Sequence, residues 1–372
     1  MNDRVLFVSS HARPGGSERY LTRLVHGLDD RVAKVVALED GWLVDELEPR
    51  PAVIPTTAHW RSLVGAARVL RRELEVARPA LVHANGIKAA VVAALATVRT
   101  GIPFVWVKHD FSHGGLLSNV VAARSARIVG VSAAVASALP RRYAAKVTVV
   151  HPAVDVEPAD RDEARRAVAA LAGRPEGSEF VALVGRLDPY KGHGELIEIL
   201  GALRAEHPKL HAVFVGGDDP SHPLEPERLR GLASRAGVAD AISWLGHQPD
   251  ACRLVAGCSL LVVPTSAASD GLGTEGFGLA PLEAFAVGTP VAGYAAGALP
   301  EVLGDCAVLV PPGDREALRA AIDDLLRDGR RRTTLAACGQ DLVSNRYTVA
   351  AMLEGMSRVY DEVAREARHG RD

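Results

Sequence analysis

Two loop cations, Arg186 and Lys191, are the residues in this sequence best placed to hold a phosphate group. They follow the apolar run 180–184, and each has a glycine beside it, Gly185 or Gly192. Arginine presents a fixed fork of donors and lysine a compact charge, the two usual ways in which proteins hold phosphate. The alternative is that both are solvated cations on an ordinary loop.

A second candidate stretch runs from Glu275 to Glu283, after the apolar run 260–263 and a glycine-rich loop. We expect a helix to begin near Leu279, which leaves Glu275 on the loop and puts Glu283 about one turn inside. The free N–H groups of residues 276–279 suit a sugar oxygen or a phosphate. Carboxylates accept hydrogen bonds from vicinal hydroxyls, so the pair suits a hydroxyl-rich ligand. The alternative is a helix-capping glutamate and a surface glutamate.

A third loop contains Gly15 and Gly16, between the apolar run 5–8 and a helical stretch over 17–28. Glycines at this place allow the backbone to approach a phosphate or sugar closely. The spacing is not G-x-G-x-x-G, and a plain strand-to-helix turn is the alternative.

These loops belong to two series of alternating strands and helices. The first series ends at 147–150, residues 151–155 form a hinge, and the second series runs from 180–184 to 307–310 before two amphipathic helices. Such alternation predicts parallel sheets covered on both faces by helices, with ligands at the carboxyl ends of the strands. The fold class is therefore α/β, with two doubly wound domains over residues 1–152 and 153–352.

Composition excludes several other classes of protein. A chain of 372 residues favours two domains, and 48% hydrophobic with 24% charged residues is typical of a soluble protein. The net charge of −2 argues against a protein that coats nucleic acid, since such proteins usually have a strong excess of basic residues. No apolar run approaches the ~20 residues of a membrane span, and the first residues lack signal-peptide features. The cysteines have no metal-ligand spacing, so we expect four buried thiols in a cytoplasmic protein. They are Cys252, Cys258, Cys306 and Cys338.

Two groups of residues resemble sites that we do not expect to form. His109 and His113 have metal-ligand spacing and Asp218-Asp219 is an acidic pair, but zinc needs three or four ligands and no third is indicated. We therefore predict no metal site. The arginine-rich helix 61–78 favours a solvated basic face, with an anionic membrane as the alternative.

Taken in order along the chain, these motifs resemble glycosyltransferase family 4, whose members are retaining enzymes of the GT-B fold. The resemblance rests on the following residues: Gly15-Gly-Ser-Glu-Arg19, Arg186 with Lys191, Glu275 with Glu283, Gly288-Thr-Pro-Val291 and Gly297-Ala-Leu-Pro-Glu301. It implies two facing Rossmann-like domains with a cleft between them. The first domain would bind the acceptor and the second the nucleotide-sugar donor, with the C-terminal helix 353–372 packing back on the first.

The resemblance also implies roles for the residues of the second domain. Arg186 and Lys191, next to Gly185, would hold the donor diphosphate and stabilise it as a leaving group. Glu275 would bind donor-sugar hydroxyls and Glu283 the nucleotide ribose. The backbone from Phe277 through Gly278 to Leu279 would contact the sugar or phosphate.

In the first domain, the resemblance implies that Gly16 lies near the phosphates across the cleft and that His109 lies beside the transferred sugar. We expect Asp110 and His113, which follow His109, to face the acceptor, with Asp110 as a partner for an amine. Three departures leave the donor sugar open: the long loop 264–274, His151-Pro152 at the hinge, and Pro189-Tyr190 between the two cations.

The predicted activity is transfer of a hexose or related sugar from a UDP-sugar co-substrate, without metal or cofactor. The loop 107–114 is similar to transferases that act on aminocyclitols of aminoglycoside antibiotics, so a small polar acceptor is favoured. Exopolysaccharide or cell-envelope glycan synthesis is the alternative. A hydrolysing sugar-nucleotide epimerase or a binding-only relative is the alternative of another class, because fold does not determine function.

Overall fold

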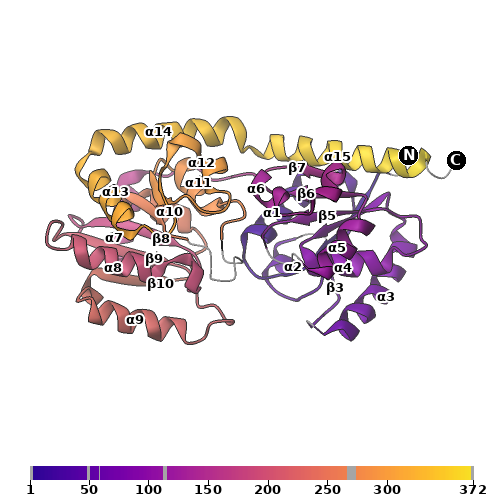
Figure 1. The fold of residues 1–372 in the computed structure, drawn as a ribbon, viewed down its shortest axis with the longest axis horizontal. Helices are drawn as coiled ribbons and strands as arrows, with labels where there is room; N and C mark the ends of the chain where they lie inside the picture. Colours follow the sequence, from indigo (N-terminus) through magenta and orange to yellow (C-terminus); the bar gives the residue numbers. More distant parts are fainter. Residues whose placement is uncertain (1–2, 48–50, 58, 112–114, 266–273, 370–372) are drawn as a thin grey trace. The chain divides into compact units, whose positions relative to one another are not determined.

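The computed structural model describes residues 3–47, 51–57, 59–111, 115–265 and 274–369. The chain forms two compact units (Figure 1): unit 1 comprises Met1–Ala153 and Val349–Asp372, and unit 2 comprises Val154–Thr348. The first boundary differs by one residue from the one predicted at 152/153. The second lies at 348/349, because the C-terminal helix α15 (Val349–His369) starts earlier than residue 353.

Unit 1 is built on a seven-stranded parallel sheet in the order β3-β2-β1-β4-β5-β6-β7. Its strands are short and rich in valine, as expected of strands buried on both faces. Their bounds are β1 (Val5–Ser9), β2 (Val32–Ala37), β3 (Ala52–Val53), β4 (Leu81–Asn85), β5 (Phe104–Lys108), β6 (Arg127–Gly130) and β7 (Val147–Val149).

Helices cover both faces of this sheet. Leu6 and Val8 pack in one core with α3 (Trp60–Ala77), α4 (Ile87–Ala96) and α5 (Leu116–Arg124). Phe7, which lies between them on β1, points to the other face and contacts Tyr360 of α15. That face also carries α1 (Gly16–Gly27), which packs against α15. The shorter helices are α2 (Trp42–Glu46), α6 (Ala133–Ser137) and the 3-10 turns η1 (Asp29–Arg31) and η2 (Arg141–Lys146).

Unit 2 repeats this plan with a six-stranded parallel sheet in the order β10-β9-β8-β11-β12-β13. Its strands are β8 (Glu179–Val184), β9 (Leu210–Val215), β10 (Ile242–Gly246), β11 (Leu260–Val263), β12 (Val291–Tyr294) and β13 (Val308–Val310). One face packs against α8 (His193–Leu203), α9 (Glu225–Arg235) and α13 (Arg315–Arg327). The other helices are α7 (Arg161–Ala172), α10 (Ala251–Ala256), α11 (Leu279–Ala286), α12 (Leu299–Leu303) and α14 (Gly329–Arg346), with turns η3 (Pro189–Lys191), η4 (Ala239–Ala241) and η5 (Gly304–Cys306).

Both strand orders reverse direction once. In unit 1 the reversal lies between β1 and β4, and in unit 2 it lies between β8 and β11. Loops diverge at such a switch point and leave a crevice at the carboxyl ends of the strands, where ligands bind in open α/β sheets. The loops that carry Gly16, Arg186 and Glu275 all follow strands at these two points. The predicted α/β class with two doubly wound sheets is confirmed.

The prediction of four free thiols is wrong for one pair. Cys306 and Cys338 form a disulfide with a Cα–Cα distance of 5.3 Å, although 32 residues separate them in sequence. They meet because η5 packs against α14, a tertiary contact that cysteine spacing does not reveal. Cys252 and Cys258 form no disulfide; Cys258 is buried, as expected, whereas Cys252 is only partly buried. Within the described part of the chain, no helix is long and apolar enough to cross a bilayer.

Candidate active site

Lys191 and Glu275 meet at the switch point of unit 2. Lys191 ends η3 in the loop after β8, and its Nζ lies 2.5 Å from Oε1 of Glu275, in the loop after the adjacent strand β11. Thr265 donates its hydroxyl to the same carboxylate oxygen at 3.1 Å. The two side chains are only 19% and 16% exposed. The structure thus brings together one predicted phosphate ligand and one predicted sugar ligand.

Lys191 keeps its positive charge in this buried place. Burial by itself acts to lower the pKa of Lys191, but the neighbouring carboxylate of Glu275 outweighs it and the pKa is raised. Gly185 leaves space for the lysine stem, since a Cβ at that residue would lie 3.2 Å from Cδ of Lys191. Gly192 has a positive φ of 78°, and a Cβ there would lie 2.3 Å from the carbonyl oxygen of Pro264. Both glycines therefore shape the loop that holds the lysine.

Arg186 is held by an acidic side chain that the sequence analysis did not assign to the site. Its Nη1 lies 2.9 Å from Oδ2 of Asp219, which is 3% exposed, whereas the arginine side chain is 54% exposed. Burial acts to raise the pKa of Asp219, but the Ser221 amide and the Arg186 guanidinium outweigh it, so the pKa is lowered. The guanidinium is thus anchored at one end and open to solvent at the other.

Asp219 also has two further potential metal ligands beside it, contrary to our expectation that no third ligand would be found. Ligand atoms of Asp188, Asp219 and His222 lie within 4.8 Å of one another. The sequence analysis missed this cluster because Asp188 follows β8 whereas the other two follow β9. A parallel bridge between Leu187 and Asp218 joins the two loops.

Helix α11 begins at Leu279, as predicted, so Glu275 lies on the preceding loop. The N-cap residue of α11 is Gly278, with a φ of 92°, and a Cβ at this residue would lie 2.8 Å from Cδ2 of Leu299. The first amides of a helix have no partner within the helix, so this end suits an anion or a sugar oxygen. Phe277 is buried edge-on against Tyr347, at 5.4 Å between ring centroids, so its side chain is part of the core. Glu283 is 7% exposed.

Unit 1 has a cavity of about 120 Å³ at its own switch point, lined by both polar and apolar groups. The ends of β4 and β5, the loops after β1, β4 and β5 and the start of α1 supply its walls, which include Glu18, Asn85, Lys108, His109 and Asp110. Lys108 is 4% exposed and lies 3.7 Å from the carboxylate of Asp110. His113 and residues 266–273 of the long loop lie outside the described residues.

His109 is a neutral side chain in this cavity. Burial lowers its pKa to about 4, and its Nε2 lies 2.6 Å from Oδ1 of Asn85. The amide nitrogen of Asn85 donates to the carbonyl of Ser17 at 3.1 Å, so the amide oxygen faces the histidine. Nε2 is therefore the protonated nitrogen, and Nδ1 is an acceptor at neutral pH.

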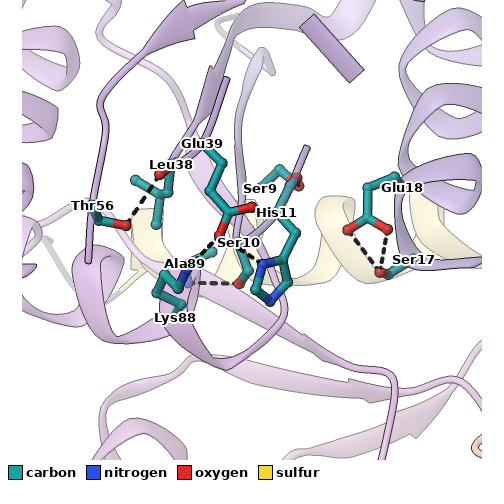
Figure 2. A network of polar contacts seen from close by, with 10 residues as sticks. All are labelled: Ser9, Ser10, His11, Ser17, Glu18, Leu38, Glu39, Thr56, Lys88 and Ala89. Carbon is teal, nitrogen blue, oxygen red and sulfur yellow. Dashed lines mark hydrogen bonds and ion pairs between the residues drawn. The ribbon is translucent and has the colours of Figure 1, made fainter. Parts of the chain in front are cut away.

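A network of polar contacts positions the loop after β1 (Figure 2). Glu39 accepts hydrogen bonds from Lys88 at 2.8 Å and from His11 at 3.0 Å, and the hydroxyl of Ser10 accepts from the Ala89 amide at 2.9 Å. These bonds connect the loop after β1 to the ends of β2 and the start of α4. The loop is thereby fixed at the edge of the cavity.

Glu18 is a buried acid that the sequence analysis did not place in the site. Its carboxylate accepts a hydrogen bond from the Ser17 hydroxyl at 2.8 Å (Figure 2). Burial raises its pKa, against the opposing effect of that hydrogen bond. A Cβ on Gly15 would lie 2.6 Å from this carboxylate, which therefore lies at the N-terminus of α1, beside Gly16. The signal for Glu18 in the sequence is its place at the third position of the helix, where a carboxylate can bind free amides.

Comparisons with known proteins agree with this architecture. The family model for glycosyl transferases group 1 matches residues 165–341, and the model for glycosyltransferase family 4 matches residues 14–158. The D-inositol 3-phosphate glycosyltransferase of Salinispora arenicola is 32% identical, over 76% of this chain and 68% of that protein. The protein of the same name from Stackebrandtia nassauensis is 28% identical, over 98% of this chain and 93% of that protein.

Solved structures match both units. HepE of Anabaena, in complex with UDP and glucose, has a TM-score of 0.83 at 22% identity and covers 96% of this chain and 99% of its own. Sucrose-phosphate synthase from Thermosynechococcus elongatus has a TM-score of 0.81 at 20% identity, with coverage of 97% and 98%. These likenesses concern the fold, whereas the family models and the curated relatives concern the sequence. Together they show that the chain is a glycosyltransferase of family 4 with the GT-B fold.

Proposed function

We propose that this enzyme transfers a hexose or related sugar from a UDP-sugar to a hydroxyl of a small polar acceptor, with retention of configuration and without a metal ion. The observation that carries the proposal is the contact between Lys191 and Glu275 at the switch point of unit 2. It supports a donor site in which a cation for the diphosphate and a carboxylate for the sugar hydroxyls lie side by side. UDP is favoured because UDP and UDP-glucose are bound in the matching structures of HepE.

The chemistry follows from the charges that develop during transfer. Breaking the anomeric C–O bond leaves positive charge on the sugar and negative charge on the diphosphate. Lys191, Arg186 and the N-terminus of α11 stabilise that anion more strongly as it forms, which lowers the barrier. Oε1 of Glu275 is occupied by Lys191 and Thr265, so we assign its other oxygen, Oε2, to the donor-sugar hydroxyls. Glu283 is the proposed ribose ligand.

Retention is proposed to occur by substitution on one face of the sugar, with a phosphate oxygen of the leaving group taking the acceptor proton. Neutral His109 supports this route: it offers a hydrogen-bond acceptor at Nδ1 without placing a second positive charge beside the developing oxocarbenium ion. Its role is to position the transferred sugar.

The cavity of unit 1 supports a hydroxyl-rich ring as the acceptor. Its walls include several polar side chains, and the carboxylates of Glu18 and Asp110 outnumber the single buried cation, Lys108. That balance favours a neutral or amine-bearing ring, such as an aminocyclitol, over a phosphorylated one. The relatives named above are D-inositol 3-phosphate glycosyltransferases, so a cyclitol-like ring is a reasonable starting point for a screen.

The test is a ligand panel followed by product analysis. A donor at 100 times its dissociation constant stabilises the protein by about 2.7 kcal/mol, so UDP-sugars should raise the melting temperature more than GDP- or TDP-sugars. Transfer to inositol, inositol phosphate and aminocyclitols is then followed by NMR, which reports the anomeric configuration. Chelator should leave the rate unchanged. Epimer formation from the UDP-sugar without acceptor would refute the transferase proposal, and loss of activity in chelator would implicate the cluster at Asp219.

A further inference from the structure

Asp219 of unit 2 is a buried carboxylate paired with an exposed arginine. Its side chain is 3% exposed, whereas the side chain of Arg186, whose Nη1 lies 2.9 Å from Oδ2 of Asp219, is 54% exposed. Burying a carboxylate costs free energy even where it is paired, and an ion pair with an exposed partner contributes little to stability. Stabilisation of unit 2 is therefore a poor explanation for this pair.

Both oxygens of the Asp219 carboxylate are engaged. Oδ1 accepts a hydrogen bond from the Ser221 amide at 2.9 Å, and Oδ2 faces the guanidinium of Arg186. The backbone carbonyl of Asp219 also accepts a hydrogen bond from the His222 amide at 2.8 Å. The loop after β9 thus holds the carboxylate in one orientation, so the carboxylate can fix the direction of the arginine.

The backbone around this pair is closely packed. Leu187 donates its amide to the carbonyl of Gly217 at 2.9 Å, beside the parallel bridge between Leu187 and Asp218. A Cβ at Gly216 would overlap the carbonyl oxygen of Gly185, so this approach requires glycine. The loop after β9 therefore lies directly against the loop after β8, which carries the arginine.

The loop after β8 also presents Lys191, and a second buried acid shapes it. Asp188 is 8% exposed and accepts a hydrogen bond from the Tyr190 amide at 3.3 Å, at the start of the turn η3 that ends at Lys191. Carboxylate oxygens of Asp188 and Asp219 lie within 4.8 Å of each other. Two neighbouring buried acids thus organise the loop that carries both predicted phosphate ligands.

We propose that Asp219 is a positioning residue for the donor, which holds the Arg186 guanidinium so that its remaining N–H groups face the diphosphate. A guanidinium has five N–H donors in a rigid plane, so contact through Nη1 leaves most of them for phosphate oxygens. An exposed arginine without such an anchor has many rotamers, and ordering it would weaken donor binding. The inference rests on the proposed function, because that function supplies the diphosphate.

The alternative is that Asp219 is only a counter-ion for the arginine. The two roles predict changes of opposite sign when the carboxylate is removed. A negative charge close to the diphosphate opposes its binding, so loss of a mere counter-ion should strengthen UDP binding. Loss of a positioning residue should weaken UDP binding by about 10–100-fold, by analogy with the partners that orient metal-ligating side chains.

The experiment measures UDP binding by calorimetry, uridine binding by NMR, and kcat and KM for the UDP-sugar. Asp219→Ala should weaken UDP binding and leave uridine binding unchanged, because uridine has no phosphate for Arg186 to bind. Asp219→Glu keeps the charge but displaces the guanidinium, so it should weaken UDP binding as well. In an Arg186→Met background, Asp219→Ala should change UDP affinity by less than about threefold, because Asp219 acts through the arginine.

Glu225 provides a matched control in the same unit. Its side chain is 6% exposed and pairs at 2.6 Å with Arg228, whose side chain is 52% exposed, so this pair has the same asymmetry. Glu225→Ala should leave UDP binding, kcat and KM unchanged. Circular dichroism checks that each variant is folded, and Asp219→Glu, which retains the buried charge, tests the proposal where the alanine variant does not fold.

Four results would overturn the proposal: UDP binding by the Asp219 variants at least as tight as that of the wild type, equal weakening of UDP and uridine binding, an undiminished effect in the Arg186→Met background, or an equal loss in Glu225→Ala. A wild type that binds UDP but transfers no sugar would refute the proposed function alone. A wild type that binds no UDP would refute both.

Discussion

Replacing Lys191 with methionine should separate the stability of the donor site from its catalysis. The substitution keeps the length of the side chain and removes the charge, which leaves Glu275 mostly buried with Thr265 as a remaining partner. Removing one member of a buried ion pair costs about 3–5 kcal/mol. Both side chains retain some exposure, so we expect about 3 kcal/mol, the lower end of that range. For a unit of this size that corresponds to a fall in melting temperature of about 6–12 °C.

The double variant Lys191→Met with Glu275→Gln distinguishes the two roles. Removing both charges should restore about 2 kcal/mol of the lost stability, because the uncompensated carboxylate is gone. Turnover should not recover: loss of one group that stabilises a developing anion lowers kcat by about 10²–10³. Unfolding is measured by heat and denaturant, and turnover as UDP released from the donor.

A matched control comes from an exposed ion pair in the same unit. Arg204 and Asp240 form a pair whose side chains are 38% and 64% exposed. Arg204→Met should change stability by less than about 1 kcal/mol and leave kcat unchanged, because exposed pairs contribute little. If Lys191→Met were no more destabilising than this control, the pair would not be a buried one. If it retained kcat within tenfold, the lysine would not stabilise the leaving group.

Three further predictions follow from the same contacts. The pKa of His109 is about 4 in the folded protein, below its ordinary value, because the buried side chain favours its neutral form. The fold therefore has its full stability above about pH 6.5, and it loses stability as the pH falls toward 4 because the unfolded chain binds the proton more tightly. His109→Gln should reduce the fall in unfolding free energy between pH 7 and pH 4 by up to about 3 kcal/mol, and an unchanged pH dependence would contradict the burial argument. Gly192→Ala combines a positive φ with a Cβ 2.3 Å from a backbone oxygen, so it should destabilise unit 2 by about 1–3 kcal/mol and lower kcat, whereas Gly173→Ala, which has a positive φ in open space, should lower stability only. Cys306→Ser should lower the unfolding free energy by about 3–4 kcal/mol, the entropy of closing a 32-residue loop, and dithiothreitol should have the same effect on the wild type but none on the variant.

The architecture of both units was predictable from local patterns. Apolar runs such as 180–184 and 260–263 are long enough only for strands, and the helical stripe over 61–78 became α3 within one residue at each end. Glycine and proline mark the turns, which is why the start of a helix near Leu279 could be predicted. The structure confirms it, because α11 begins at Leu279. Each of these features depends on neighbours within a few residues, which is why a single sequence reveals it.

The candidate site was predictable only in part. Arg186, Lys191 and Glu275 were identified by residue type and by their place after strands, and the structure puts all three at the switch point of unit 2. Their roles toward a donor remain predictions. The sequence analysis noted Asp219 only as part of an acidic pair, because its proximity to Arg186 depends on how β8 and β9 align in the sheet.

By itself, the sequence determined the α/β class, the order of strands and helices, the two-domain plan and the loops that carry chemistry. Tertiary structure alone decided which of these groups meet: Lys191 with Glu275, His109 with Asn85 and Cys306 with Cys338. The physical reason is that secondary structure arises from interactions between residues close in the chain, whereas strand order and helix packing bring together side chains 24 to 84 residues apart. Charge state follows the same division, since the contact with Glu275 keeps Lys191 charged against the effect of burial, whereas burial keeps His109 neutral.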